Sequence, residues 1–113
     1  MFNPFSFLSD DTAVSPDEVK RALDAKESVA ILDVRTPEEY AQGHIKDSKL
    51  VPLQEIAQKV GSLGKKDQKM YVYCRSGARS AQAIAFLRQQ GFTDVHNMSG
   101  GIMAWLHKQY PLL

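Results

Sequence analysis

The chain has 113 residues and a mass of 12.6 kDa, which suffices for one domain with its own core but not for two. Its formal net charge is +1, and hydrophobic residues (43%) and charged residues (24%) lie near globular averages, which disfavours disorder, coiled coil and collagen-like repeats. The single cysteine, Cys74, excludes an internal disulfide and therefore a disulfide-built secreted scaffold. We expect one domain that spans residues 1–113.

Three phenylalanines stand within the first eight residues: Phe2, Phe5 and Phe7. No lysine or arginine precedes them and Asn3-Pro4 interrupts them, so they lack the pattern of a secretory leader. No later stretch reaches the roughly eighteen apolar residues of a membrane span, and we expect a cytoplasmic protein without a membrane partner. Residues 1–14 are predicted to be an N-terminal flap or arm, which either packs on the domain or binds a partner.

The charges are unevenly distributed along the chain. Residues 1–45 carry nine acids and four bases, whereas residues 46–113 carry four acids and ten bases. Basic runs with interleaved aromatic residues are absent, so the sequence disfavours nucleic acid as a partner. The basic second half suits a small anionic substrate or an acidic partner protein, although solvated surface lysines would give the same imbalance.

Alternating helix and strand signals begin at residue 15. Ser15-Pro16-Asp17-Glu18 forms a capping box and predicts a helix up to Asp24. The apolar run Val29–Val34 is typical of a buried parallel strand. Thr36-Pro37-Glu38-Glu39 repeats the capping-box pattern and predicts a short helix that Gly43 ends.

The same alternation continues to the end of the sequence. The remaining predicted elements, in chain order, are a strand at 49–51, a helix at 53–60, a strand at 69–73, a helix at 80–90, a strand at 94–98 and a helix at 102–108. Parallel strands need crossover connections, and helices at this spacing supply them. The predicted fold is therefore α/β, with three α/β/α layers around a mostly parallel sheet of about five strands.

In an open α/β sheet the ligand site lies beyond the carboxyl ends of the strands. The strand at 69–73 leads directly into Cys74, and a helix follows at Ser80. Backbone N–H groups in such a strand-to-helix loop form an anion-binding nest, which the positive end of the helix reinforces. We therefore identify the loop that begins at Cys74 as the candidate site.

The composition of this loop favours a reactive thiolate. A free cysteine has a pKa of ~8.5, and cysteines near helix N-termini and arginines fall to roughly 3.5 to 7.5. Cys74 is therefore predicted to be the catalytic nucleophile, and the predicted substrate-binding residues are Arg75, Ser76, Gly77, Ala78, Arg79 and Ser80. Two alternatives stay open: Ser80 could be only an N-cap, and Cys74 could be a buried structural thiol.

Three segments in this order give the sequence a strong resemblance to the rhodanese (thiosulfate sulfurtransferase) family in its single-domain form. They are 33–45 with Asp-Val-Arg-Thr-Pro-Glu-Glu-Tyr, the loop 74–80 with Cys-Arg-Ser-Gly-Ala-Arg-Ser, and 91–105 with Gly-Phe, Gly-Gly and Trp. The resemblance covers nearly the whole chain and implies a rhodanese-like fold.

The resemblance also implies a mechanism. Cys74 would take the outer sulfur of thiosulfate or a related donor, hold it as a persulfide against the loop amides, and pass it to a thiophilic acceptor. Arg75 and Arg79 would attract the small anionic donor. The acceptor would be cyanide, a thiol or a protein thiol such as that of a thioredoxin, and no cofactor is implied.

Two other functions remain as alternatives. Phosphatases and arsenate reductases related by fold also use a loop cysteine and arginine, but with five intervening residues where Cys74 and Arg79 have four. The loop also lacks an aspartate that could protonate a leaving alkoxide. The other alternative is a rhodanese-like module that binds a partner or senses redox state, because a low-pKa thiol is readily oxidised.

Residues outside the loop have weaker functional signals. Asp33 and Arg35 are expected to form a structural ion pair, and Tyr73 is expected in the core. His44 is expected to hydrogen-bond the backbone. The three scattered histidines and one cysteine lack the spacing of a metal site, so no metal is predicted.

Overall fold

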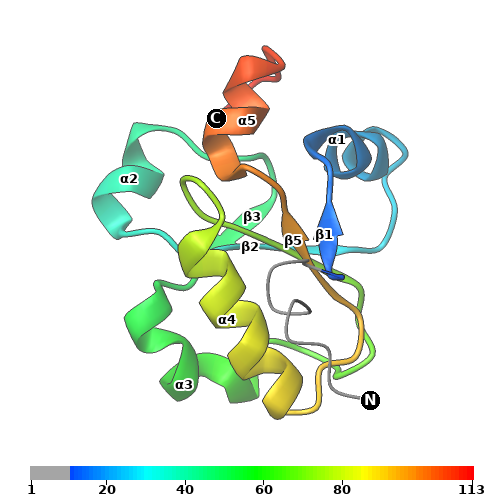
Figure 1. Cartoon of the computed structure of the whole chain (residues 1–113), viewed down its shortest axis with the longest axis vertical. Helices are drawn as coiled ribbons and strands as arrows, with labels where there is room; N and C mark the ends of the chain where they lie inside the picture. The colour runs from blue at the N-terminus through cyan, green and yellow to red at the C-terminus, as the bar shows by residue number, and fades with distance from the viewer. Residues whose placement is uncertain (1–10) are drawn as a thin grey trace, which may run out of the picture.

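The computed structural model describes residues 11–113, which form a five-stranded parallel sheet between two layers of helices (Figure 1). The strand order is β1-β5-β4-β2-β3. The strands are β1 (Ala13–Val14), β2 (Ala30–Asp33), β3 (Ser48–Leu50), β4 (Met70–Tyr73) and β5 (Val95–Met98). The predicted fold class is confirmed.

A helix follows each strand, and the first two helices start at the caps that the sequence indicates. They are α1 (Pro16–Asp24), α2 (Pro37–Gln42), α3 (Ile56–Lys59), α4 (Ala78–Gln89) and α5 (Gly101–His107). Ser15 caps α1 by accepting the N–H of Glu18, and Thr36 and Glu39 form a reciprocal capping box at α2. The capping box predicted at Thr36 is therefore confirmed. At Ser15 only the N-cap half of the predicted box forms, because the Glu18 carboxylate pairs with Arg21 instead.

Two elements differ from the prediction. The helix expected at 53–60 is divided into the 3-10 turn Leu53–Glu55, the single turn α3 and the 3-10 turn Val60–Ser62. Ala13–Val14, predicted as part of the N-terminal flap or arm, pair with β5 as the edge strand β1. A two-residue strand is too short to show a period-two pattern, which is why the sequence did not indicate it. Phe2, Phe5 and Phe7 lie outside the described residues.

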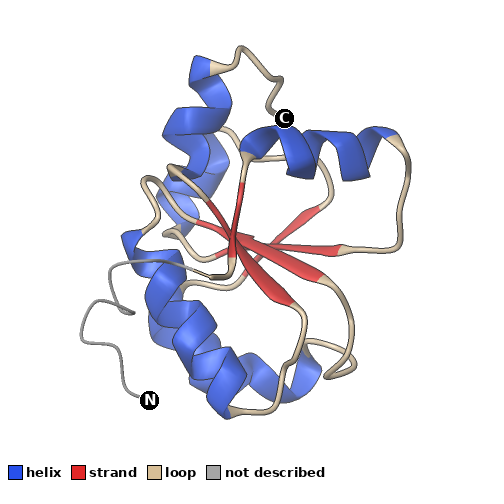
Figure 2. Ribbon diagram, turned by 45° about the vertical axis from the view of Figure 1, so that its right-hand side comes forward, coloured by secondary structure: helices blue, strands red, loops and turns tan. Residues whose placement is uncertain are grey.

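Helices lie on both sides of the sheet (Figure 2). The sheet separates two apolar clusters, because successive side chains along a strand point to opposite faces. Ile31, Tyr71 and Tyr73 face α1 and α5, where Trp105 is buried. The opposite face packs on α3 and α4, with Leu32, Met70, Val72, Cys74, Ile84 and Leu87 in its cluster. Because every strand runs in the same direction, the segments after β2, β4 and β5 meet at one edge of the sheet.

Candidate active site

The sequence-predicted loop lies at that edge, between the end of β4 and the start of α4 (Figure 1). Gly77 is the N-cap of α4 and adopts φ 114, a left-handed conformation that a residue with a Cβ rarely takes. The helix therefore starts at Ala78, two residues before the predicted Ser80. The loop is a four-residue turn from Cys74 to Gly77 that places the first turn of α4 over the cysteine.

Hydrogen-bond donors surround the sulfur of Cys74. Its Sγ accepts the backbone N–H of Gly77 at 3.1 Å and that of Ser80 at 3.4 Å. The Ser80 hydroxyl lies 3.4 Å from the same sulfur. The side chain is only 1% exposed, so the sulfur meets these donors rather than water. The arrangement suits a negatively charged sulfur.

These contacts have a net effect on the acidity of the thiol. Burial raises the pKa of Cys74, but the hydrogen bonds from the Ser80 hydroxyl and from the N–H groups of Ser80, Gly77 and Ser76 lower it. The net shift of the Cys74 pKa is downward. Burial of Cys74 alone would indicate a structural thiol, whereas the donor set indicates a thiolate site.

The first turn of α5 orients the loop peptides. The N–H of Ile102 donates to the Cys74 carbonyl at 2.9 Å, and the N–H of Met103 donates to the Arg75 carbonyl at 3.1 Å. In a trans peptide the next N–H points opposite to the carbonyl, so the N–H groups of Arg75 and Ser76 point away from α5. The Ser76 N–H is among those that lower the Cys74 pKa.

This close approach depends on Gly101. A Cβ at that position would lie 2.4 Å from the Arg75 carbonyl oxygen and 2.5 Å from that of Cys74, and φ is +60. Only glycine fits there without moving the loop. Gly101 is thus both the first residue of α5 and the point at which this helix packs against the loop.

A buried polar network, which the sequence did not indicate, supports the helix side of the loop. The Ser80 hydroxyl donates to Asn97 Oδ1 at 2.7 Å, and Asn97 Nδ2 donates to the Gly77 carbonyl at 3.3 Å. Asn97 lies on β5, 5% exposed. A lone asparagine in a strand gives no signal of its own, because its partners come from the loop and helix after β4.

Arg79 has a specific partner. Its guanidinium donates to Glu39 Oε1 at 2.7 Å and to Oε2 at 3.0 Å, a bidentate pair that joins the first turn of α4 to that of α2. The Arg79 hydrogen bond lowers the pKa of Glu39 to about 2. Glu39 also caps α2, which is the role that the sequence predicted for it. Its pairing with Arg79 could not be predicted from a local sequence pattern, because the two residues are forty positions apart.

The other predicted loop residues are exposed. Arg75, Ser76 and Ala78 face solvent, and Arg75 lines a pocket of about 280 Å³ together with Glu39 and other residues. Among residues 11–113 the Arg75 guanidinium has no hydrogen-bond or ion-pair partner. Within the described part of the chain, Arg79 of the loop is therefore paired and Arg75 is not.

The expected ion pair of Asp33 and Arg35 is confirmed as a buried structural pair. Arg35 donates to both carboxylate oxygens of Asp33, at 2.7 and 3.0 Å, and to the Gly43 carbonyl at 2.8 Å. Tyr73 is 1% exposed, and the His44 ring contacts the Tyr40 carbonyl at 3.0 Å, as expected. These contacts tie the segment after α2 to the end of β2 beside the loop.

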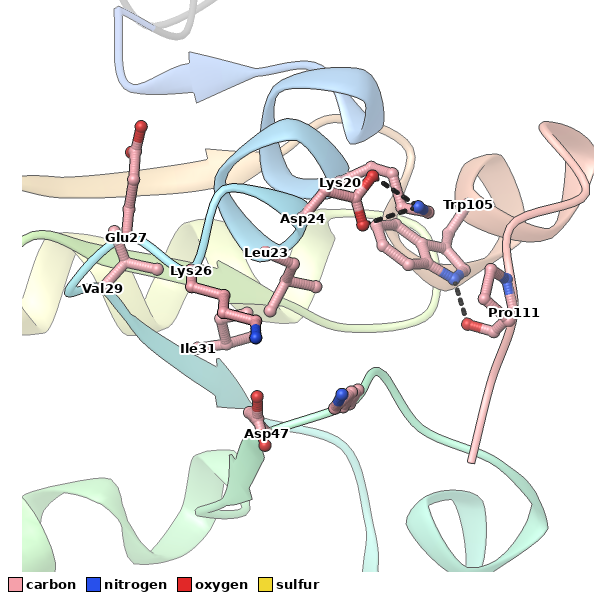
Figure 3. Close-up of a pocket in the computed structure, with 11 residues that line it drawn as sticks. Lys20, Leu23, Asp24, Lys26, Glu27, Val29, Ile31, Asp47, Trp105 and Pro111 are labelled. Atoms are coloured by element: carbon pink, nitrogen blue, oxygen red, sulfur yellow. Dashed lines mark hydrogen bonds and ion pairs between the residues drawn. The ribbon is translucent and has the colours of Figure 1, made fainter.

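A larger pocket of about 380 Å³ lies away from Cys74, between α1, β2 and Trp105 (Figure 3). At its rim Lys20 pairs with Asp24, and Trp105 Nε1 donates to the Pro111 carbonyl at 2.9 Å. None of residues 74–80 lines it. The described part of the chain contains no helix long and apolar enough to span a membrane.

Comparison with known proteins gives a consistent result. Residues 15–108 match the family described as "Rhodanese-like domain". The chain is 40% identical over 100 residues to a "Sulfurtransferase" of Allochromatium vinosum, covering 88% of this chain and 92% of that protein. It is 35% identical to the "Probable adenylyltransferase/sulfurtransferase MoeZ" of Mycobacterium tuberculosis H37Rv, covering 88% of this chain and 26% of MoeZ.

A solved structure supports the fold assignment. The crystal structure of a rhodanese-related protein from Thermoplasma volcanium superposes with a TM-score of 0.80 at 32% sequence identity. The match covers 89% of this chain and 96% of that one. The two chains therefore share their fold over most of their length.

Proposed function

The chain belongs to the rhodanese-like domain family, which includes relatives named sulfurtransferase, and we propose that it transfers sulfane sulfur through a persulfide on Cys74. The proposed donor is thiosulfate or a related anionic persulfide, and the acceptor is a thiophile. No metal or cofactor takes part in this scheme.

One observation carries the proposal: hydrogen-bonding groups of the loop and of α4 converge on Cys74 Sγ. Backbone N–H groups and the Ser80 hydroxyl point at a sulfur that is buried from water. Such donors stabilise the charge of a thiolate and of the persulfide anion that follows it, at no cost of reorganisation. A structural thiol has no need of two backbone N–H groups directed at its sulfur.

The transfer divides into two displacements. In the first, the Cys74 thiolate attacks the outer sulfur of thiosulfate; a new S–S bond forms, the S–S bond of thiosulfate breaks, and sulfite leaves with the electron pair. In the second, the acceptor attacks the outer sulfur of the persulfide, and the Cys74 thiolate is regenerated. Sulfite departs before the acceptor reacts, so the kinetics should be ping-pong.

The two arginines are proposed to attract the dianionic donor unequally. Arg75 is exposed and unpaired among the described residues, so its guanidinium is available to an incoming anion. Arg79 is already paired with Glu39 and would contribute less charge until that pair opens. The family resemblance alone gave the two residues the same role.

Steady-state kinetics with thiosulfate and cyanide test the proposal. Parallel lines in the double-reciprocal plots and loss of at least about 10³-fold in kcat for Cys74→Ser are expected, because the nucleophile is removed. Circular dichroism should show an unchanged fold, since the substitution is nearly isosteric. A Cys74→Ser variant that retains the parent rate would refute the mechanism.

A further inference from the structure

The exposed apolar side chains of the described chain gather beside the Cys74 loop. Met103 is 48% and Leu106 45% exposed, and apart from Leu113 they are the exposed large hydrophobic residues within 11–113. They lie three positions apart on α5 and therefore share one helix face, next to the face that buries Ile102 and Trp105. A helix of this kind normally carries polar residues on its outer face.

This face borders the pocket of about 280 Å³ that Arg75 lines. Its walls include Arg35, Glu39, Arg75, Met103, Leu106 and Leu112, contributed by the segments after β2 and β4, by α2, by α5 and by the residues that follow it. Figure 1 shows the start of α5 above the loop that leads into α4 and beside α2. Apolar surface of this kind next to a reactive group marks a contact site.

The charges on the pocket wall define the complementary partner. Arg35 is paired with Asp33, and Glu39 is paired with Arg79. Arg75 has no charged partner within residues 11–113, so the occupant that fits brings a carboxylate to Arg75 and an apolar side chain to Met103 and Leu106. Because Arg75 directly follows Cys74, that occupant is held next to the sulfur.

We infer that the surface formed by Arg75, Met103, Leu106 and Leu112 docks a protein acceptor whose thiol is flanked by an apolar and an acidic residue. This inference rests on the proposed sulfur transfer and names the partner of its second step. The acceptor thiolate attacks the outer sulfur of the Cys74 persulfide, an S–S bond forms on the acceptor, and the electron pair of the broken bond returns to Cys74. The acceptor thiol first releases its proton to solvent.

Synthetic peptides with one cysteine test this surface. The first has leucine before and aspartate after the cysteine; a matched peptide has serine and lysine there. With the persulfide formed on Cys74, we expect kcat/KM to be about tenfold higher for the leucine-aspartate peptide than for the serine-lysine peptide. A factor of this size is typical of one well-placed contact residue. Leu106→Gln should reduce that preference to about twofold, whereas His107→Gln, an exposed change on the same helix, should leave it intact.

Cyanide as acceptor separates this inference from the proposed function. Normal cyanide turnover in Leu106→Gln with a lost peptide preference supports the docking surface. Normal cyanide turnover with equal rates for both peptides in the parent overturns the docking surface but leaves the proposed function standing. No persulfide and no cyanide turnover in the parent would refute the proposed function itself.

Light scattering on a sizing column tests the competing occupant, a second copy of the chain. A monomeric parent is the expected result. A dimeric parent that Leu106→Gln converts to a monomer would overturn the inference, because the surface would then be an interface between copies.

Discussion

Hydrogen bonds from its own loop and from the first turn of α4 lower the pKa of the buried Cys74 thiol. Burial opposes ionisation and the hydrogen bonds favour it, and the net shift of the Cys74 pKa is downward because the hydrogen bonds together outweigh burial. The Ser80 hydroxyl has a single proton, and its 2.7 Å contact to Asn97 competes with its 3.4 Å contact to the sulfur. A charged sulfur would draw that proton toward itself.

Removal of this hydroxyl should change the pH profile of Cys74. The thiolate fraction rises with pH through the thiol pKa, so the rate of alkylation by iodoacetamide should rise with pH and then level off. Ser80→Ala loses the strongest of the pKa-lowering hydrogen bonds, so the midpoint of that curve should move to higher pH. A midpoint that stays in place or falls would contradict the assigned role of the hydroxyl.

The pairing of Arg79 with Glu39 should limit how well the site attracts an anion. In Glu39→Gln the Arg79 guanidinium loses its carboxylate partner. The cap of α2 remains, because a glutamine side chain can also accept the Thr36 N–H. We expect KM for thiosulfate to fall by about threefold or more, with a steeper dependence on salt. Steady-state assays at two ionic strengths measure both quantities.

Glu38→Gln is the matched control for this change. It removes the same charge from the neighbouring position of α2, where the side chain is exposed and has no contact with Arg79. If Glu39→Gln and Glu38→Gln change KM equally, the pairing of Arg79 with Glu39 does not limit how well the site attracts thiosulfate. The same conclusion follows if Glu39→Gln leaves KM at the parent value.

Among the secondary-structure elements, α5 acts on the site without touching the sulfur. Its first N–H groups fix the carbonyls of Cys74 and Arg75, and Gly101 allows the backbones to approach this closely. The orientation of the loop amides is thus imposed by an element that follows the loop by some twenty-five residues.

Gly101→Ala tests this dependence. The added Cβ must displace the Arg75 carbonyl, and the residue must hold φ +60, so the free energy of unfolding should fall by about 1–3 kcal/mol. The rate of sulfur transfer should fall as well, because the N–H groups of the Cys74 loop would no longer point at the sulfur. Urea unfolding and cyanide assays measure both, with Gly61→Ala as control, since nothing lies within 4 Å of a Cβ there.

If Gly101→Ala retains both parent stability and parent turnover, the packing of α5 on the loop does not position the amides. If only stability falls, the packing of α5 on the loop is structural, and other contacts orient the loop N–H groups. We expect the free energy of unfolding and the turnover to fall together.

At the scale of the whole molecule, local patterns predicted most of the fold but not the contacts between distant segments. Helix N-caps at Ser15 and Thr36 and apolar runs placed the helices and strands to within two or three residues, because those signals depend on near neighbours. The loop at Cys74 was found for the same reason. The partners Glu39, Asn97 and Gly101 were missed as site residues, since each meets the loop only through the tertiary fold.

The shared core should make the site depend on global stability. Leu87 is fully buried on α4 in the same apolar cluster as Cys74. Leu87→Ala should lower the free energy of unfolding by about 2–5 kcal/mol, whereas Leu106→Ala, at an exposed site, should cost less than about 1 kcal/mol. Equal costs in urea unfolding would contradict the assignment of the core.

Intact-protein mass spectrometry under non-reducing conditions, before and after thiosulfate, tests the central claim most directly. We predict a gain of about 32 Da, one sulfur atom, on the parent and none on Cys74→Ser, with reversal by cyanide or a thiol. No gain with thiosulfate or with glutathione persulfide would contradict persulfide transfer. It would favour a rhodanese-like module that binds a partner or senses redox state.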